Sequence, residues 1–245
     1  MGVLEAQSVS VKFGGHMAVI DADIDVETGR VTGLIGPNGA GKTTLFNVMT
    51  GLQAPVAGKI LLNGIDVTQF APHDRAQRGM ARTFQRIELF GSLTARENLQ
   101  VAAEIKRSFA ANAQPVDERI DHVIELVGLR PFIDTRADVL TTGQARLVEL
   151  GRALVTRPKV VLLDEPASGL DADETESFAK LLQQLTREGL AILLVEHDIP
   201  LVMKVCHRVF VLDLGRVIAS GTGEEVQRDQ RVIAAYLGAP ADVGH

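Results

Sequence analysis

The chain has 245 residues, of which 46% are hydrophobic and 23% charged, which suits one large globular domain or one domain with an insertion. Its net charge of −6 argues against nucleic acid as a partner, because nucleic-acid-binding proteins usually present a basic surface. The single cysteine, Cys206, excludes a disulfide framework. We expect a reducing cytosol, no signal peptide and no membrane span, since the apolar runs are far shorter than the roughly 20 residues that a spanning helix needs.

The N-terminal part predicts strands on both sides of a glycine-rich turn. Alternating apolar residues indicate half-buried strands over 9–13 and 20–26, and a short apolar run before the turn indicates a buried strand. A helix is expected directly after the turn. A further strand over 59–62 ends at Asn63-Gly64, a pair typical of hairpin turns.

Residues 86–140 are predicted to be mostly helical, as an insertion between two parts of the core. Thr94 and Glu97 have the spacing of a capping box, in which both side chains satisfy backbone donors at a helix start. Apolar residues at helical spacing indicate a further helix over 116–127, which Gly128 ends.

After Pro158 the pattern alternates between strands and helices. Apolar runs indicate buried strands over 160–163 and 190–195, separated by an amphipathic helix over 171–187. Two short strands then flank a turn at Gly215. Buried strands that alternate with helices predict an α/β fold with a largely parallel sheet covered on both faces.

Residues 36–43 read GPNGAGKT and fit the phosphate-binding pattern G-x-x-x-x-G-K-[ST] between a predicted strand and a predicted helix. Glycine backbone angles turn successive N–H groups toward a phosphate, Lys42 would reach the β and γ phosphates, and Thr43 would offer its hydroxyl to Mg²⁺. A glycine-rich turn with an incidental lysine is the alternative, which the strand and helix context disfavours. The residues expected at the nucleotide are Gly36, Pro37, Asn38, Gly39, Ala40, Gly41, Lys42, Thr43 and Thr44.

The buried strand over 160–163 ends in two carboxylates, Asp164 and Glu165. Asp164 would hold Mg²⁺, and Glu165 would orient and polarise an attacking water, because α/β sheets bind ligands at the carboxyl ends of their strands. A solvated strand end is the alternative for these two acids taken alone. Phe13 either stacks on adenine or belongs to the core, since it continues an apolar stripe.

Together, these motifs resemble the ATPase subunit of ATP-binding cassette (ABC) transporters over nearly the whole chain. The resemblance implies an α/β fold with a P-loop NTPase (RecA-like) core, an N-terminal antiparallel β subdomain and an inserted α-helical subdomain. As a single ABC ATPase domain over 1–245, the chain would divide into a nucleotide-binding core with the β subdomain (1–85 and 155–245) and a helical subdomain (86–154) that carries the signature motif.

The resemblance also implies roles for single residues. Phe13 stands at the position of the family's adenine-stacking aromatic residue. Residues 83–85 (TFQ) match the family's Q-loop, whose glutamine contacts Mg²⁺ or the attacking water and senses the membrane subunit. Asp171 ends the D-loop match at 168–171, and His197 matches the switch histidine, which contacts the γ-phosphate. The catalytic residues would be Glu165, His197, Gln85 and Lys42, and the Mg²⁺ ligands would be Thr43, Gln85 and Asp164.

Residues 140–144 (LTTGQ) stand where the family has the signature motif Leu-Ser-Gly-Gly-Gln. Thr142 replaces a glycine, and a β-branched side chain would be strained there if the position needed a positive φ. A plain helix N-cap is the alternative for this stretch. The resemblance implies contact with the nucleotide held by a second subunit through Thr141, Thr142, Gly143, Gln144 and Asp171.

Segments 81–99 and 221–238 resemble the ATPase subunits of branched-chain amino acid importers, and importers of urea or amides and a lipopolysaccharide-export ATPase are similar too. The resemblance implies ATP and Mg²⁺ as cofactors, hydrolysis that powers membrane transport, and a cytoplasmic place on the inner face of the cell membrane. The expected partners are a second ATPase subunit, identical or different, transmembrane permease subunits and a substrate-binding protein, but no nucleic acid. Ile87, Leu89 and Phe90 would suit a groove for a partner helix, or they belong to the core.

Two other classes of function stay open at this point. A soluble cassette ATPase that acts on nucleic acid or ribosomes is disfavoured, because such relatives usually carry coiled coils, zinc cysteines or two cassettes, and this chain is acidic. A P-loop kinase or regulatory nucleotide binder fits the phosphate-binding loop but leaves Asp171, His197 and the acids at 164–165 unexplained.

Overall fold

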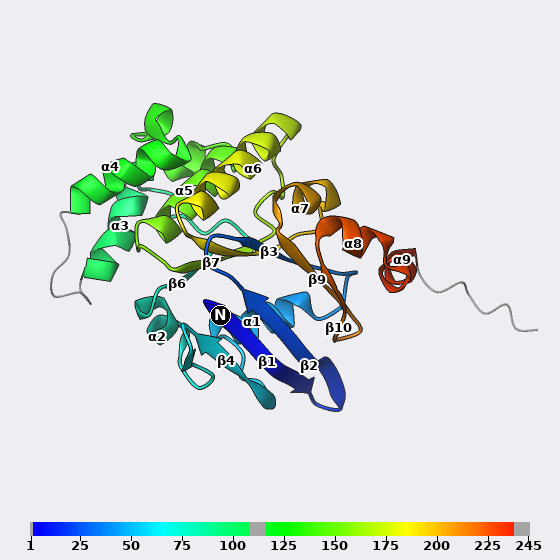
Figure 1. Ribbon diagram of the computed structural model, residues 1–245. Coiled ribbons are helices and arrows are strands. Elements are labelled where there is room, and N and C mark those ends of the chain that lie inside the picture. Colours follow the sequence, from blue (N-terminus) through cyan, green and yellow to red (C-terminus); the bar gives the residue numbers. More distant parts are fainter. Residues whose placement is uncertain (1, 108–115, 238–245) are drawn as a thin grey trace, which may run out of the picture.

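Two β-sheets organise the part of the chain that the computed structural model describes, residues 2–107 and 116–237 (Figure 1). The larger sheet has six strands in the order β10-β9-β3-β8-β7-β6, and all neighbours are parallel except β9 and β10. Its strands are β3 (Val31–Ile35), β6 (Met80–Arg82), β7 (Val160–Asp164), β8 (Ala191–Val195), β9 (Arg208–Asp213) and β10 (Arg216–Gly221).

The smaller sheet is antiparallel and has the order β2-β1-β4-β5. It consists of β1 (Leu4–Phe13), β2 (His16–Val26), β4 (Ala57–Leu62) and β5 (Ile65–Asp66). The predicted α/β fold, with a largely parallel sheet and an N-terminal antiparallel sheet, is therefore confirmed.

Nine α-helices and two short 3₁₀ helices complete the described residues. The α-helices are α1 (Lys42–Thr50), α2 (Pro72–Gln77), α3 (Ala95–Arg107), α4 (Val116–Val127), α5 (Thr142–Leu154), α6 (Ala172–Arg187), α7 (Ile199–Val205), α8 (Gly223–Arg228) and α9 (Gln230–Leu237). The 3₁₀ helices are η1 (Arg130–Phe132) and η2 (Ala137–Val139). Within the predicted helical stretch, residues 108–115 lie outside the described residues, as does Gly238 at the end of the importer-like segment.

The central parallel strands separate two apolar cores, because successive side chains of a strand point to opposite faces. Val161 and Leu163 of β7 face the core formed with α3 to α6, whereas Val160 and Leu162 face the core shared with α1 and the antiparallel sheet. Figure 1 shows the same division, with α3 to α6 on one side of the parallel sheet and the antiparallel sheet on the other. Strands buried on both faces appear in the sequence as continuous apolar runs, which is why they were predictable.

The predicted capping box at Thr94 and Glu97 is present, and another capping box begins α6. At α3, the Glu97 amide donates to the Thr94 hydroxyl (3.2 Å) and the Thr94 amide donates to the Glu97 carboxylate (2.7 Å). At α6, Asp171 and Glu174 make the same two bonds at 2.8 and 3.1 Å. Each pair satisfies two backbone donors that a helix start otherwise leaves unpaired.

Several short elements have no counterpart in the predicted pattern. The three-residue strand β6 is at the edge of the sheet and, among the described residues, pairs only with β7. Helix α2 has six residues and begins with proline. In contrast, β1 is longer than predicted, because Leu4 and Ala6 extend its buried face. Phe13 at the end of β1 is 50% exposed and thus lies outside the core.

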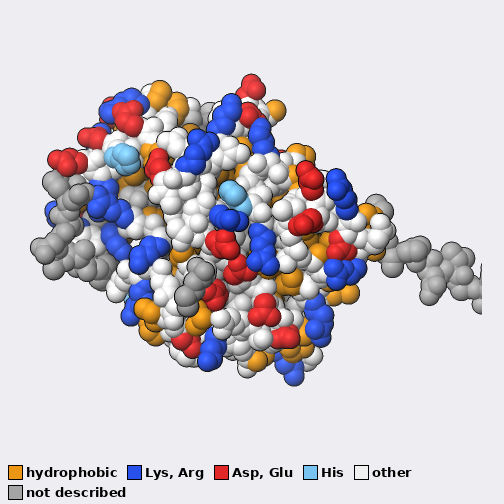
Figure 2. All heavy atoms as spheres, viewed as in Figure 1, with side chains coloured by type: hydrophobic (Ala, Val, Ile, Leu, Met, Phe, Trp, Pro, Cys, Tyr) orange, Lys and Arg blue, Asp and Glu red, His pale blue; other side chains and the backbone are white. Residues whose placement is uncertain are grey.

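Among the described residues, no helix combines the length and the apolarity that crossing a membrane requires. The face in Figure 2 carries acidic and basic side chains that are interspersed.

Candidate nucleotide-binding and hydrolysis site

The phosphate-binding loop joins β3 to α1, and its shape depends on glycines. Gly36 has φ 153° and Gly41 has φ 104°. A side chain on Gly36 would place its Cβ 2.0 Å from the carbonyl oxygen of Leu212, and one on Gly41 would place it 2.5 Å from that of Ala18. The loop therefore packs closely between β9 and β2. It leads directly into the N-terminus of α1, and in loops of this type the backbone N–H groups at that point bind phosphate.

Lys42, the first residue of α1, folds back over the loop. Its ammonium group donates to the carbonyl oxygens of Gly36 (2.6 Å) and Pro37 (3.0 Å). Burial lowers the pKa of Lys42, and the negative charges of Glu165 and Asp164 oppose that shift. The phosphate-binding loop and the acids at the end of β7 thus lie within electrostatic reach of each other, as predicted from their places at strand ends.

Gln85, Glu165 and His197 come together from three separate loops. The side-chain amide of Gln85 donates to the Glu165 carboxylate (2.9 Å), and Nδ1 of His197 lies 3.7 Å from the same carboxylate oxygen. The backbone of Glu165 has φ 46°, and its amide donates to the carbonyl of Val195 at the end of β8 (2.9 Å). A non-glycine residue in this conformation is strained, which is common where a functional side chain must be aimed.

Asp164 is a buried carboxylate at the tip of β7. Burial raises the pKa of Asp164, and the guanidinium of Arg82 is the largest influence that lowers it again. Arg82 stacks between Phe46 of α1 (4.9 Å to the ring centre) and Phe84 of the Q-loop (4.3 Å) and donates to the Thr50 hydroxyl (3.1 Å). Arg82 was not among the predicted site residues, because only the fold brings β6 beside β7.

The predicted Mg²⁺ ligands offer a hydroxyl, an amide and a carboxylate oxygen, from Thr43, Gln85 and Asp164. These are hard oxygen donors of the kind that Mg²⁺ prefers, and the cation would offset the burial of Asp164. Residues 2–107 and 116–237 hold no group of three or more His, Cys, Asp or Glu side chains that could bind a metal by themselves. Mg²⁺ usually binds through one or two protein groups and the substrate phosphates, so this donor set fits the ion.

The segment that matches the signature motif begins helix α5 with a third capping box. The Gln144 amide donates to the Thr141 hydroxyl (3.3 Å), and the Thr141 amide donates to the Gln144 side chain (3.1 Å). Thr142 is the first residue of α5 and does not have a positive φ. The backbone strain that a β-branched residue with a positive φ would have is therefore absent at Thr142. Thr141 and Thr142 are exposed, whereas Gly143 is buried against Glu174 of α6.

Arg146 and Glu149 tie the same helix to the Q-loop, and sequence reasoning did not single them out. The Arg146 guanidinium donates to the carbonyl oxygens of Phe84 (3.0 Å) and Gln85 (2.7 Å) and to the Glu149 carboxylate (2.9 Å). Both side chains are only 6% exposed. Their opposite charges three residues apart in a buried helix were the signal that could have revealed the pair.

Glu196 is a further residue near the site that was not predicted from the sequence. The residue is 1% exposed, and its carboxylate accepts N–H bonds from Ala167 (2.8 Å) and His197 (3.1 Å). Burial raises the pKa of Glu196, and these N–H bonds oppose the shift. The residue therefore joins the loop after β7 to the loop after β8, which carries His197.

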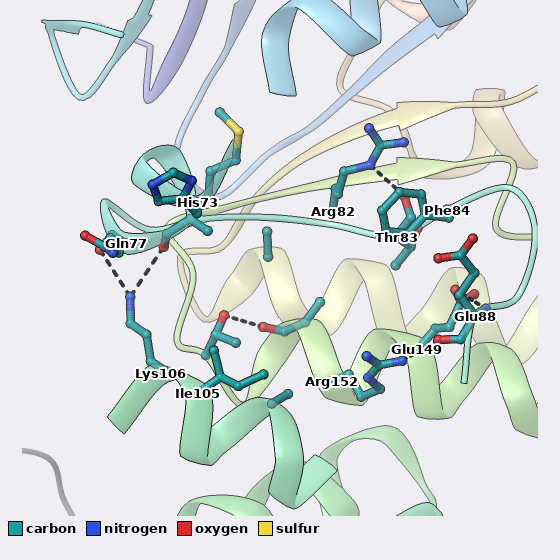
Figure 3. A pocket seen from close by; sticks show the side chains of 16 residues that line it. His73, Gln77, Arg82, Thr83, Phe84, Glu88, Ile105, Lys106, Glu149 and Arg152 are labelled. Atoms are coloured by element: carbon teal, nitrogen blue, oxygen red, sulfur yellow. Dashed lines mark hydrogen bonds between the residues drawn. The ribbon is translucent and has the colours of Figure 1, made fainter. Parts of the chain in front are cut away.

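A pocket with a cavity volume of about 300 Å³ opens beside the Q-loop (Figure 3). Phe84 and Glu88 lie at one end of the pocket, and Lys106 of α3 lies at the other, where its ammonium group donates to the carbonyl of Gln77 (3.1 Å). Ile87 and Leu89 are partly buried, and Leu89 packs against the helical core. Phe90 is 46% exposed, and Arg152 stacks on its ring.

Comparisons with known proteins agree with this geometry. The family model described as "ABC transporter" matches residues 19–168, and the model "Branched-chain amino acid ATP-binding cassette transporter" matches residues 216–242. The high-affinity branched-chain amino acid transport ATP-binding proteins BraF of Pseudomonas aeruginosa and LivG of Escherichia coli are 38% and 36% identical to the chain, each over 96% of this chain and 98% of the relative. The lipopolysaccharide export system ATP-binding protein LptB of Haemophilus influenzae is 35% identical over 97% of this chain and 98% of its own.

Solved structures of cassettes superpose over almost the whole chain. The ADP conformation of MJ1267, an ATP-binding cassette of an ABC transporter, has a TM-score of 0.88 at 31% identity and covers 97% of this chain and 99% of its own. A nucleotide-free ATP-binding cassette from an ABC transporter has a TM-score of 0.87 at 30% identity and covers 97% and 100%. The chain belongs to the ABC transporter ATP-binding family and is an ATPase subunit of that family, with the P-loop NTPase fold.

Proposed function

We propose that this ATPase subunit powers the import of branched-chain amino acids or a related small solute, as one of two cassettes bound to transmembrane permease subunits. The assignment of ATP hydrolysis to this site is supported most directly by the contact between Gln85 and Glu165 at 2.9 Å. This contact lies next to His197 and within electrostatic reach of Lys42. The C-terminal match over 216–242 and the BraF and LivG relatives support the substrate class. Export, the activity in the name of LptB, is the alternative.

In the proposed site, each residue acts on a different part of the reaction. Backbone N–H groups of residues 36–44 and the Lys42 ammonium bind the phosphates, and Phe13 stacks on adenine. Glu165 accepts a proton from the attacking water, Gln85 orients that carboxylate and the water, and His197 contacts the γ-phosphate. Thr43, Gln85 and Asp164 would hold Mg²⁺, which would supply positive charge against the phosphate oxygens.

The exposed hydroxyls of Thr141 and Thr142 support a site that two chains share. They lie at the N-terminus of α5, where a helix favours an anion, and they are open to another molecule. We infer that this segment, with Asp171, contacts the nucleotide of a second cassette, identical or different. We retain the division into a core with a β subdomain (1–85 and 155–245) and a helical subdomain (86–154) as part of this proposal.

The pocket beside the Q-loop supports docking of a permease helix. Phe84 in the pocket and Phe90 beside it, under Arg152, are 39% and 46% exposed. The pocket surface is largely apolar, and the charged side chains that line it include Glu88, Lys106 and Arg152. A helix seated there touches Phe84, the neighbour of Gln85, so the permease and the hydrolytic site would communicate through one loop. Docking of this kind would hold the subunit on the cytoplasmic face of the membrane, with a substrate-binding protein on the other side.

The test of the shared site uses Glu165→Gln, which keeps the shape of the side chain but cannot accept the proton. We expect this variant to retain ATP and to form a nucleotide-dependent dimer in gel filtration with light scattering at millimolar ATP and Mg²⁺. Glu118→Gln, an exposed position on α4, is the control and should behave as the wild type. A variant that remains monomeric under these conditions contradicts the two-chain site.

The test of the substrate class is uptake by whole cells. Cells that carry Lys42→Ala in place of the wild-type chain should lose high-affinity uptake of labelled leucine, isoleucine and valine. Loss of urea uptake with normal leucine uptake would move the assignment to the amide importers, and normal uptake of every solute with a defective outer membrane would move it to export.

A further inference from the structure

Leu214 is an exposed leucine in a strained turn at the edge of the proposed nucleotide site. It lies between β9 and β10, where Asp213 pairs with Arg216 across a two-residue loop. Leu214 and Gly215 have φ of 44° and 80°, the pair of left-handed residues that a type I′ turn requires. Within residues 2–107 and 116–237, Leu214 is the only non-glycine residue with an apolar side chain that has a positive φ.

The local chemistry disfavours leucine at this position for two independent reasons. A left-handed backbone crowds the Cβ atom of any residue except glycine, and type I′ turns prefer asparagine, aspartate or glycine there. The side chain is also 81% exposed, so the fold gains almost no burial from it.

The chain itself shows the ordinary solution in a second hairpin. Asn63 and Gly64 join β4 to β5 with φ of 51° and 76°, again as a two-residue loop, between Leu62 and Ile65. This hairpin uses the Asn-Gly pair that the turn favours, and it lies away from the phosphate-binding loop in the antiparallel sheet. The two turns are therefore matched in geometry and differ in the first residue.

The β9–β10 turn is fixed against the nucleotide-binding elements. The Gly215 amide donates to the carbonyl of Ala40 in the phosphate-binding loop (2.9 Å), and the Gly215 carbonyl accepts from the amide of Ile20 in β2 (2.7 Å). The carbonyl of Ala18 lies against both Gly215 and Gly41. Ala18 and Ile20 follow closely after His16, which is the cross-strand partner of Phe13. The β9–β10 turn and the proposed adenine-stacking ring of Phe13 therefore border the same short stretch of β2.

We propose that Leu214 makes an apolar contact with the nucleoside part of the bound nucleotide and, together with Phe13, determines how tightly the purine nucleoside is held. The proposal rests on the proposed nucleotide site. The positive φ and the exposure of this leucine are both accounted for if ligand covers its side chain. The phosphates are bound by backbone amides and Lys42, so the contribution of Leu214 concerns the nucleoside alone.

The test separates the nucleoside from the phosphates and from a second copy. Leu214→Asn should raise the melting temperature by about 2–4 °C, because the turn gains its preferred residue. In calorimetric titrations it should weaken ADP binding about five- to tenfold, while the affinity for inorganic tripolyphosphate remains that of the wild type. Leu214→Ala, which removes the side chain without relieving the turn, should show the same loss for ADP and no gain in melting temperature.

Asn63→Leu is the matched control, since it creates the unfavourable Leu-Gly turn away from the site. It should lower the melting temperature and leave ADP affinity unchanged. Unchanged ADP affinity in both Leu214 variants overturns the proposal, and so does an equal loss for ADP and tripolyphosphate, which indicates a distorted loop. The Leu214 substitutions are also combined with Glu165→Gln. If they weaken only the ATP-dependent dimer of that variant and leave ADP affinity unchanged, the proposal is overturned and Leu214 is assigned to the subunit interface. A wild type that binds neither ADP nor tripolyphosphate instead contradicts the proposed function itself.

Discussion

Replacement of Arg146 by methionine tests how helix α5, which begins at the signature-motif match, holds the Q-loop. The substitution keeps the length and apolar volume of the side chain but removes the bonds to the carbonyls of Phe84 and Gln85 and to Glu149. Because Glu149 is only 6% exposed, its carboxylate would remain buried without its partner. Loss of one member of a buried ion pair costs about 3–5 kcal/mol of unfolding free energy.

The double variant Arg146→Met with Glu149→Leu separates stability from positioning. It removes the uncompensated charge, so its unfolding free energy should return to within about 1–2 kcal/mol of the wild type. The Q-loop carbonyls still lack their charged donor, and therefore we expect kcat to fall about tenfold in both the single and the double variant, because Gln85 is no longer held against Glu165.

The pH dependence of the single variant has a definite sign. Burial raises the pKa of Glu149, and Arg146 is the main influence that opposes this. Without Arg146 the folded-state pKa rises further above that of the unfolded chain. A group of this kind destabilises the fold progressively as pH rises from its unfolded-state pKa to its folded-state pKa. The loss of stability in Arg146→Met should therefore be smallest in acid, below the unfolded-state pKa, and should grow as pH rises.

Urea unfolding followed by far-UV circular dichroism is the appropriate assay, since the chain has no tryptophan. Arg96→Met is the matched control, because it breaks the 2.6 Å ion pair with Asp121 in which the side chains are 33% and 48% exposed. Exposed pairs contribute less than about 1 kcal/mol. The reasoning is refuted if Arg146→Met costs no more than Arg96→Met, or if the double variant regains turnover together with stability.

Three further outcomes are expected. Phe13→Ala should weaken ADP binding about tenfold and change the unfolding free energy by less than about 1 kcal/mol, since the ring is half exposed; a large loss of stability in urea would instead return Phe13 to the core. Gly143→Ala should cost about 1 kcal/mol in urea unfolding, because its Cβ would lie 2.3 Å from a Glu174 carboxylate oxygen and displace the cap of α6; combination with Glu174→Ala should then add no further cost. Burial raises the pKa of Cys206 to about 12, so the thiol should react with a disulfide reagent at pH 8 only after unfolding.

The parts of the site that depend on neighbouring residues in sequence were predictable. The phosphate-binding loop needs glycines at fixed spacing, and the acids Asp164 and Glu165 follow an apolar strand directly, so both motifs carry their geometry with them. The same holds for the capping boxes, where two side chains three residues apart determine where a helix starts.

The contacts that assemble the site from distant segments were not predictable in this way. The charge of Arg82 acts on Asp164 only because β6 pairs with β7, and Glu196 reaches Ala167 only because β7 pairs with β8. Phe13 shows the limit of periodicity as well. Its strand has irregular register between Val9 and Lys12, so the alternation that suggested burial does not continue to the end of the strand.

The position of β3 in the sheet order has a consequence for biosynthesis. All five of its residues are buried, yet its neighbours β8 and β9 begin only at Ala191 and Arg208. A chain that is still emerging from the ribosome carries this apolar strand with both edges unpaired until β8 has been made, and with one edge unpaired until residues beyond 208 have been made. Nascent or truncated chains should therefore depend on holding chaperones and be cleared by proteases, whereas the completed chain buries the segment in one late step.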